Sequence, residues 1–288
     1  MAVTGPTELL ALWESGLAQQ DSGRALLLHR AARPGAGTDD LESVPLGERT
    51  ADLFALRRAL FGERMQVTLD CAGTECGAAM EFELDAAALG AARPRLSEEG
   101  LRVADGGWVV RFRLPGPADL AAVAAQAGAA QAGAAQAGAA HGGVAAAGAA
   151  AEDVAAEEAR RLLAARCVLS AVRDGREVVG EVVGEVVTVD EELGRLLPEP
   201  VLKRFAEAAE EADPAAELTL HIACPECGAT TPAELDIAAY LWTELDAWAR
   251  DVLLDVHLLA SAYGWSEPQI LALSPLRRRY YLELCADG

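Results

Sequence analysis

Residues 221–229 read HIACPECGA, and the motif at their centre, Cys224-Pro225-Glu226-Cys227-Gly228, shapes the interpretation of the whole chain. Two cysteines separated by two residues and followed by glycine are typical of a metal knuckle, a tight turn that brings both sulfur atoms to one side of the chain. In zinc ribbons such a turn joins two antiparallel strands. The motif therefore predicts a β-hairpin with two cysteines at its tip.

The same arrangement occurs once more, earlier in the chain. Cys76-Gly77-Ala78 parallels Cys227-Gly228-Ala229, and an aspartate, Asp85 or Asp236, follows nine residues after each of these cysteines. Apolar and polar residues alternate over 65–70 and again over 80–85, which predicts two half-buried strands. Each aspartate is well placed to cap the N-terminus of a following helix. The sequence thus predicts two duplicated units, each made of a strand, a cysteine knuckle, a second strand and a helix.

The four knuckle cysteines suit a single zinc ion, because zinc prefers four thiolate ligands in a tetrahedron. The second pair has the usual spacing of two intervening residues, whereas the first pair has four. We expect a shared structural zinc held by Cys71, Cys76, Cys224 and Cys227. The alternative is a pair of buried turns that has lost its metal. A redox pair is disfavoured, since a thioredoxin-like motif belongs at a helix N-terminus rather than at a hairpin tip.

The charge of the chain limits its partners. Its 288 residues include 45 acidic and 24 basic side chains, a formal net charge of −21. Nucleic acid and anionic lipid are bound through Lys and Arg, so both are disfavoured. Residues 120–151 carry no charge, but Ala and Gly supply too little apolar surface for a membrane span. The N-terminus lacks the basic start and apolar core of a signal peptide, so we expect a cytoplasmic protein.

The patterns along the chain predict an α+β fold that is mostly helical. Its expected segments are N-terminal helices over 1–63, the first knuckle hairpin and sheet over 64–116, an Ala/Gly-rich low-complexity linker over 117–151, a helical connector over 152–215, the second knuckle hairpin over 216–236, and a C-terminal helical module over 237–288. The size of the chain allows one large core or two small ones.

Two regions of this outline carry more detailed expectations. A hairpin of strands around 101–103 and 108–112, turning at 105–107, is expected to extend the sheet of the first knuckle. In the connector, one apolar stripe predicts a continuous helix formed by Ala155, Ala159, Leu162, Ala165, Leu169 and Val172. Within the linker, the repeated Gln-Ala-Gly-Ala-Ala over 126–140 predicts an unpacked connection or a frayed helix.

The C-terminal module has the clearest helical pattern. Apolar residues recur at spacings of three and four and predict one amphipathic helix about six turns long, with a stripe of Leu241, Leu245, Trp248, Val252, Val256, Leu259 and Tyr263. Gly264 suits the C-cap of this helix, and Ser266 with Gln269 predicts a capping box that starts the next one. A last helix is expected after Pro275.

Residues 241–284 also resemble the C-terminal part of the T4-type phage baseplate hub assembly chaperone family. The similarity lies in Leu245–Leu259, in YGWSE at 263–267, in ILALS at 270–274 and in RRRY at 277–280. Fainter similarity extends to residues 9–16 and to the knuckles. Members of this family are found with contractile phage tails and phage-tail-like injection systems. The resemblance implies a non-catalytic assembly chaperone or adaptor whose partners are baseplate hub or spike proteins.

The candidate partner-binding residues lie in the same module. Aromatic and arginine side chains dominate protein interfaces, which points to Trp242, Trp265, Arg277, Arg278, Arg279 and Tyr281. A simpler interpretation places the aromatic rings, together with Leu276, Tyr280 and Leu284, in the core between helices. The sequence has no phosphate-binding loop, nucleophile elbow or paired-carboxylate motif, so we do not expect an enzyme. Two alternatives stay open: a permanent structural component of the baseplate, and a zinc-ribbon regulatory protein.

Overall fold

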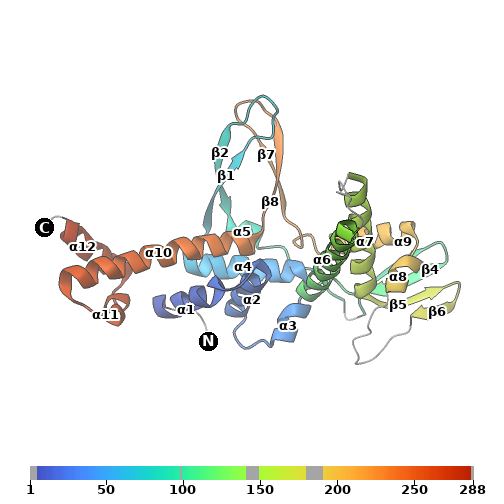
Figure 1. Ribbon diagram of the computed structural model, residues 1–288, viewed down its shortest axis with the longest axis horizontal. Coiled ribbons are helices and arrows are strands. Elements are labelled where there is room, and N and C mark those ends of the chain that lie inside the picture. Colours follow the sequence, from blue (N-terminus) through green and yellow to red (C-terminus); the bar gives the residue numbers. More distant parts are fainter. Residues whose placement is uncertain (1–4, 98, 141–148, 180–190, 287–288) are drawn as a thin grey trace. The chain divides into compact units, whose positions relative to one another are not determined.

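The computed structural model describes residues 5–97, 99–140, 149–179 and 191–286. Helices predominate and the strands form small antiparallel sheets, so the predicted α+β class is confirmed (Figure 1). The chain forms two compact units. The first, here called the ribbon unit, comprises Met1–Gly37, Asp52–Gly90 and Thr219–Gly288, and the second, the sheet unit, comprises Thr38–Ala51 and Ala91–Leu218.

The helices of the ribbon unit collect around one long C-terminal helix, which is longer than any other in the described part of the chain. They are α1 (Pro6–Leu17), α2 (Asp21–Ala32), the second part of α4 (Leu46–Phe61), α5 (Ala86–Leu89), α10 (Ile237–Tyr263), α11 (Glu267–Leu271) and α12 (Pro275–Ala286). Helix α10 packs against α1, α2, α11 and α12. Its predicted stripe is largely buried, with Leu241, Leu245 and Leu259 fully enclosed. Both predicted caps are present, the left-handed Gly264 and the Ser266/Gln269 capping box.

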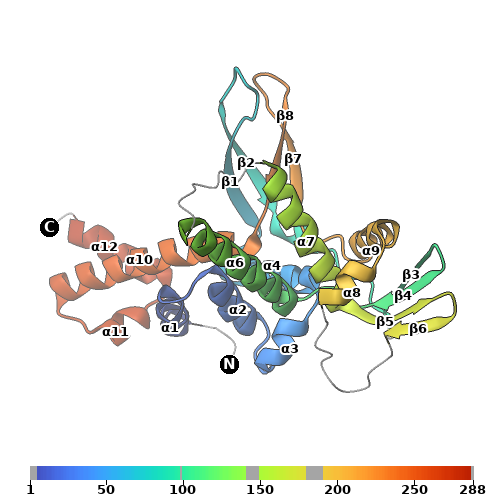
Figure 2. The same cartoon turned by 45° about the vertical axis from the view of Figure 1, so that its right-hand side comes forward.

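Two hairpins complete the ribbon unit and lie side by side in both views (Figures 1 and 2). They are formed by β1 (Arg64–Asp70) with β2 (Ala79–Asp85), and by β7 (Thr219–Ala223) with β8 (Thr230–Glu234). Asp85 accepts hydrogen bonds from the first amides of α5, and Asp236 does the same for α10. The predicted duplication of strand, knuckle, strand and capped helix is therefore present in the structure.

An ion pair deep in the ribbon unit joins α4 to α10. The guanidinium of Arg57 is almost fully buried and donates two hydrogen bonds to the carboxylate of Glu244, at 2.9 and 2.6 Å, and a third to the carbonyl of Gly62. The Tyr240 hydroxyl donates to the carbonyl of Gln66 in β1. These contacts connect the base of the first hairpin to the helices.

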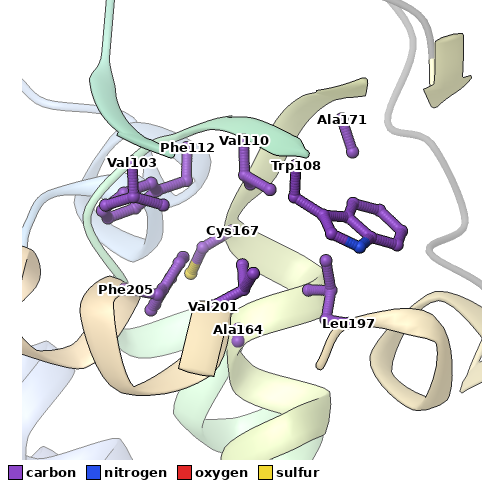
Figure 3. Close-up of a cluster of buried hydrophobic side chains, with 10 residues drawn as sticks. All are labelled: Val103, Trp108, Val110, Phe112, Ala164, Cys167, Ala171, Leu197, Val201 and Phe205. Atoms are coloured by element: carbon purple, nitrogen blue, oxygen red, sulfur yellow. The ribbon is translucent and has the colours of Figure 1, made fainter. Parts of the chain in front are cut away.

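The sheet unit is built on a four-stranded antiparallel sheet in the order β3-β4-β5-β6. The strands are β3 (Leu101–Asp105), β4 (Trp108–Phe112), β5 (Val168–Arg173) and β6 (Arg176–Val179), and the helices are α3 (Thr38–Ser43), the start of α4, α6 (Pro117–Ala140), α7 (Ala149–Cys167), α8 (Glu191–Leu196) and α9 (Glu199–Ala212). Alternate residues of β4 point inward and meet α7 and α9, as Figure 3 shows. The rings of Phe112 and Phe205 lie 4.0 Å apart at this contact.

Two expectations for this region were wrong. The helix predicted to continue to Val172 ends at Cys167, and Leu169 and Val172 belong to β5. The hairpin of β3 and β4 pairs with β5 and β6, so it does not extend the sheet of the first knuckle. Residues 117–140, expected to be a linker or a frayed helix, form helix α6.

The predicted segments also differ from the observed units, since 64–116 is divided between them and the helical connector contains two strands. A second repeat in the sequence is Val-Val-Gly-Glu over 178–185. Its first two residues end the edge strand β6, and the rest lies outside the described residues.

A buried carboxylate organises the end of the sheet unit where α6 begins. Asp119 has only 2% of its surface exposed and accepts hydrogen bonds from Arg113 at 2.6 and 2.9 Å, from Arg166 at 3.2 Å and from the Gly116 amide at 3.0 Å. Burial acts to raise the pKa of Asp119, but these donors outweigh it and hold the pKa below its usual value. The carboxylate thus stays ionised and joins α6, the end of β4 and the end of α7.

Candidate functional site

The four knuckle cysteines meet between the tips of the two hairpins. The Sγ atoms of Cys71 and Cys227 are 3.6 Å apart, those of Cys76 and Cys224 are 3.8 Å apart, and all four lie within 4.8 Å of one another. Four sulfurs placed 2.3 Å from one zinc ion in a tetrahedron would be separated by about 3.8 Å. The donor set and its spacing therefore fit a tetrahedral thiolate site for one metal ion.

Backbone geometry explains how each turn presents its pair of sulfurs. The amide of Cys71 donates to the carbonyl of Ala78 at 2.9 Å, and the amide of Cys224 donates to Ala229 at 2.8 Å. Each turn passes through a left-handed glycine, Gly77 (φ 57°) or Gly228 (φ 73°), a conformation that residues with a Cβ adopt only under strain. The two knuckles therefore close in the same way despite their different spacing.

The wider spacing of the first knuckle brings one further glycine to the sulfur cluster. Gly73 donates its amide to Cys71 Sγ at 3.3 Å, and a Cβ at this position would lie 3.3 Å from the sulfurs of both Cys71 and Cys227. The amide of Ala72 donates to the Thr231 hydroxyl at 3.0 Å and so ties one hairpin to the other. The two additional residues of the first knuckle therefore lie beside the sulfur atoms and do not move them apart.

The thiols differ in exposure and acidity. Cys71 and Cys224 are buried, Cys76 is half-buried and Cys227 is exposed, and all four are reduced. Hydrogen bonds from the amides of Cys227 and Glu226 lower the pKa of Cys224 to about 7. Burial and the neighbouring thiols outweigh the amide of Ala78 and raise the pKa of Cys76 to about 12. Cys224 therefore ionises more readily than Cys76, and a bound cation would stabilise the thiolate form of each.

The predicted partner residues are divided among different surroundings, and the half-buried Trp242 faces α1 within the ribbon unit. Its ring packs on Gly16 of α1, and the guanidinium of Arg24 lies 4.8 Å from the ring centroid. Trp265 stacks on Tyr263 with ring centroids 4.7 Å apart, and Tyr281 meets both rings edge-on. These aromatic side chains hold α10, α11 and α12 together.

The contact of Trp242 with α1 makes Gly16 sensitive to substitution. A Cβ at Gly16 would lie 2.3 Å from the indole ring, so Gly16→Ala must displace it. We expect a net destabilisation of about 1–2 kcal/mol, because the cost of overpacking exceeds the gain in helix propensity. Thermal denaturation will measure it. In α6, Gly128 has open space around it. Gly128→Ala is the matched control and should leave the melting temperature unchanged or raised.

The arginine run of α12 does not form one surface. Arg277 is exposed, Arg279 is bonded to Glu283 at 3.1 Å, and Arg278 is buried with 5% of its surface exposed. Three apolar residues of α12 point outward instead: Leu276, Tyr280 and Leu284 are 66%, 62% and 62% exposed. Residues spaced four apart form a stripe along one side of a helix. The sequence alone does not show whether this side faces the core or the solvent.

Comparison with known proteins finds a matching protein family. Residues 36–238 match the protein family described as T4 bacteriophage base plate protein. The chain belongs to this family. The match includes both cysteine pairs, both hairpins and the sheet unit of the baseplate protein, and it ends at the start of α10. No curated protein matches the chain, and no solved structure does.

The family membership confirms the baseplate relationship that the sequence predicted. The matched residues include the cysteine cluster but not α12, which carries four of the six predicted partner residues. Among the described residues of this baseplate protein, no helix combines the length and apolar character needed to cross a membrane.

Proposed function

We propose that this baseplate protein is a non-catalytic assembly chaperone or adaptor for the baseplate hub of a contractile phage tail or phage-tail-like injection system. Its partners would be hub or spike proteins, met in the cytoplasm before the particle is complete. Family membership supports the link to the baseplate. The exposed apolar side chains of the C-terminal module support a role in binding another protein, because large apolar residues gathered on a surface are typical of protein interfaces.

The proposed client-binding surface lies on this module. Arg277 and Arg279 are exposed beside the outward stripe of α12 and would attract a partner with an acidic rim. Trp265 and Tyr281 are half-buried in the aromatic cluster and would hold α12 in place. Arg278 is buried and would contribute through the fold, and the half-buried Trp242 would do so by packing on α1.

We also propose that the four-cysteine site holds a structural zinc ion. Four thiolates with the observed sulfur separations are the donor set that structural zinc prefers, and four protein ligands would fill the coordination of a tetrahedral ion. Cys71, Cys76, Cys224 and Cys227 would each supply one thiolate. The metal would fix the two hairpins against each other and carry no chemistry.

The composition of assembled particles tests the proposed function. We expect that cells lacking the chain assemble few complete particles, and that particles from normal cells contain far less than one copy of the chain per baseplate position. Quantitative mass spectrometry of purified particles, with tube and sheath proteins as internal standards, measures this ratio. A fixed stoichiometric ratio would identify a permanent baseplate component instead. Normal assembly without the chain would exclude both roles.

A further inference from the structure

Helix α12 is held with its apolar stripe facing away from the protein. On the opposite side, Tyr281 meets the rings of Tyr263 and Trp265 at centroid distances of 5.7 and 4.9 Å. The same side buries Arg278, whose charge interacts with Asp255 of α10. The stripe of Leu276, Tyr280 and Leu284 cannot turn inward without breaking these contacts. Its exposure is therefore a fixed property of the fold.

The stripe is symmetric about its central residue. Leu276 and Leu284 lie four residues before and after Tyr280, which places one large apolar side chain on each of three consecutive turns. If a second α12 packs antiparallel with Tyr280 on the twofold axis, Leu276 of one copy meets Leu284 of the other at both ends. A self-complementary pattern of this kind is what an isologous contact between two identical chains requires.

On one flank of the stripe the charges of the two copies would balance. Arg279 and Glu283 lie on the same side of the stripe, where they form an ion pair within one helix. In an antiparallel pair of helices the same flanks face each other, so each Arg279 would lie between Glu283 and Arg279 of the other copy, about 3 Å from each along the axis. Arg277 lies on the opposite flank, and its two copies would be about 9 Å apart along the axis, close to the screening length at physiological salt.

We propose that the outward stripe of α12 binds the same stripe of a second copy of this chain, antiparallel and centred on Tyr280. Large exposed apolar surfaces promote aggregation, and pairing would cover this one while no client is bound. The contact involves three large side chains per copy and is smaller than a typical stable interface. The dimer is therefore weak and depends on protein concentration, so that a client can displace the second copy. The displacement step rests on the proposed function, whereas the dimer does not.

Sedimentation of the purified full-length chain tests the pairing. We expect a reversible change from monomer to dimer between about 10 µM and about 1 mM, the range in which a contact this small dissociates. Leu276→Ser with Leu284→Ser should leave a folded monomer at every concentration, as checked by circular dichroism. The matched control is Leu254→Ser, which changes an exposed leucine of α10 and should leave the dimer unaffected.

Cross-linking tests the register. In a Cys285→Ser background, Tyr280→Cys should form a disulfide with its own copy on mild oxidation, because only residue 280 lies on the twofold axis. Leu276→Cys should not link to itself but should link to Leu284→Cys in a mixture of the two proteins. Peptide mass spectrometry identifies the linked positions. A chain that stays monomeric throughout, or a dimer that survives the double serine variant, overturns the proposal.

These results are separable from the proposed function. A monomer whose double serine variant fails to support particle assembly would remove the dimer and keep the client surface. A dimer without any effect of the chain on assembly would keep the pairing and remove the chaperone role.

Discussion

Replacing Cys224 by serine is expected to abolish metal binding and to destabilise the ribbon unit by at least about 3 kcal/mol, a decrease in melting temperature of roughly 10 °C. The reason is the distance of the two knuckles along the chain. Cys76 and Cys224 are 148 residues apart, yet their sulfurs lie 3.8 Å from each other. Leu69, Met80 and Ile222 pack around the buried cysteines, and the Ala72 amide donates to Thr231. A metal ion bound by all four thiolates would be the strongest link between the two tips.

The measurement combines metal analysis with thermal denaturation. The unaltered chain should contain about one zinc per molecule, released by thiol alkylation, and Cys71→Ser should behave like Cys224→Ser. Cys285→Ser is the matched control, because Cys285 is half-buried and distant in sequence from the knuckles. It should change stability by less than about 1 kcal/mol. A chain that melts at the same temperature with and without metal would favour the alternative of two empty turns.

The second large effect is expected for Asp119→Asn in the sheet unit. The substitution keeps the shape of the side chain but removes the charge that Arg113 and Arg166 share. Both guanidiniums are partly exposed, with 42% and 32% of their side-chain surface accessible, so water will compensate part of the loss. We expect a destabilisation of about 2–4 kcal/mol, measured by chemical denaturation.

Acid sensitivity gives a second measure of the same carboxylate. Since the pKa of Asp119 is lower in the folded state than in the unfolded chain, its stabilising contribution is fully present above the unfolded pKa of about 3.9. This contribution is lost as the pH falls below that value and through the folded pKa. The stability of Asp119→Asn should therefore depend less on pH in this window. Glu158→Gln, which removes an exposed carboxylate 4.0 Å from Arg195, should alter stability by less than about 0.5 kcal/mol.

The sequence predicted the ribbon unit well, because its signals are local and occur twice. Cysteine spacing, the glycine after each pair and the capping aspartates Asp85 and Asp236 each specify one turn, and their repetition indicated that the two knuckles belong together. A single two-stranded hairpin is only marginally stable and is stabilised by packing against a second one. For this reason we predicted that the two knuckles share one site.

The sheet unit was predicted less well, for a physical reason. Leu169 and Val172 are three residues apart, and this spacing fits the end of a helical stripe as readily as it fits a strand with a bulge. Pairing of β5 with β4 decides between the two, and no local pattern encodes it. The ion pairs of Arg57 with Glu244 and of Asp119 with two arginines are likewise partnerships between distant residues among many equivalent charges.

The division of the ribbon between two distant parts of the chain affects how the protein is made. A ribosome adds roughly 5–20 residues per second, so the first knuckle is finished about 7–30 s before the second one is synthesised. During that interval Cys71 and Cys76 have no partner thiols from the second knuckle, while the sheet unit emerges and can fold. Metal capture at the proposed site would thus be a late step of biosynthesis, and the speed of translation would decide how long the first pair of thiols exists before the second pair is made.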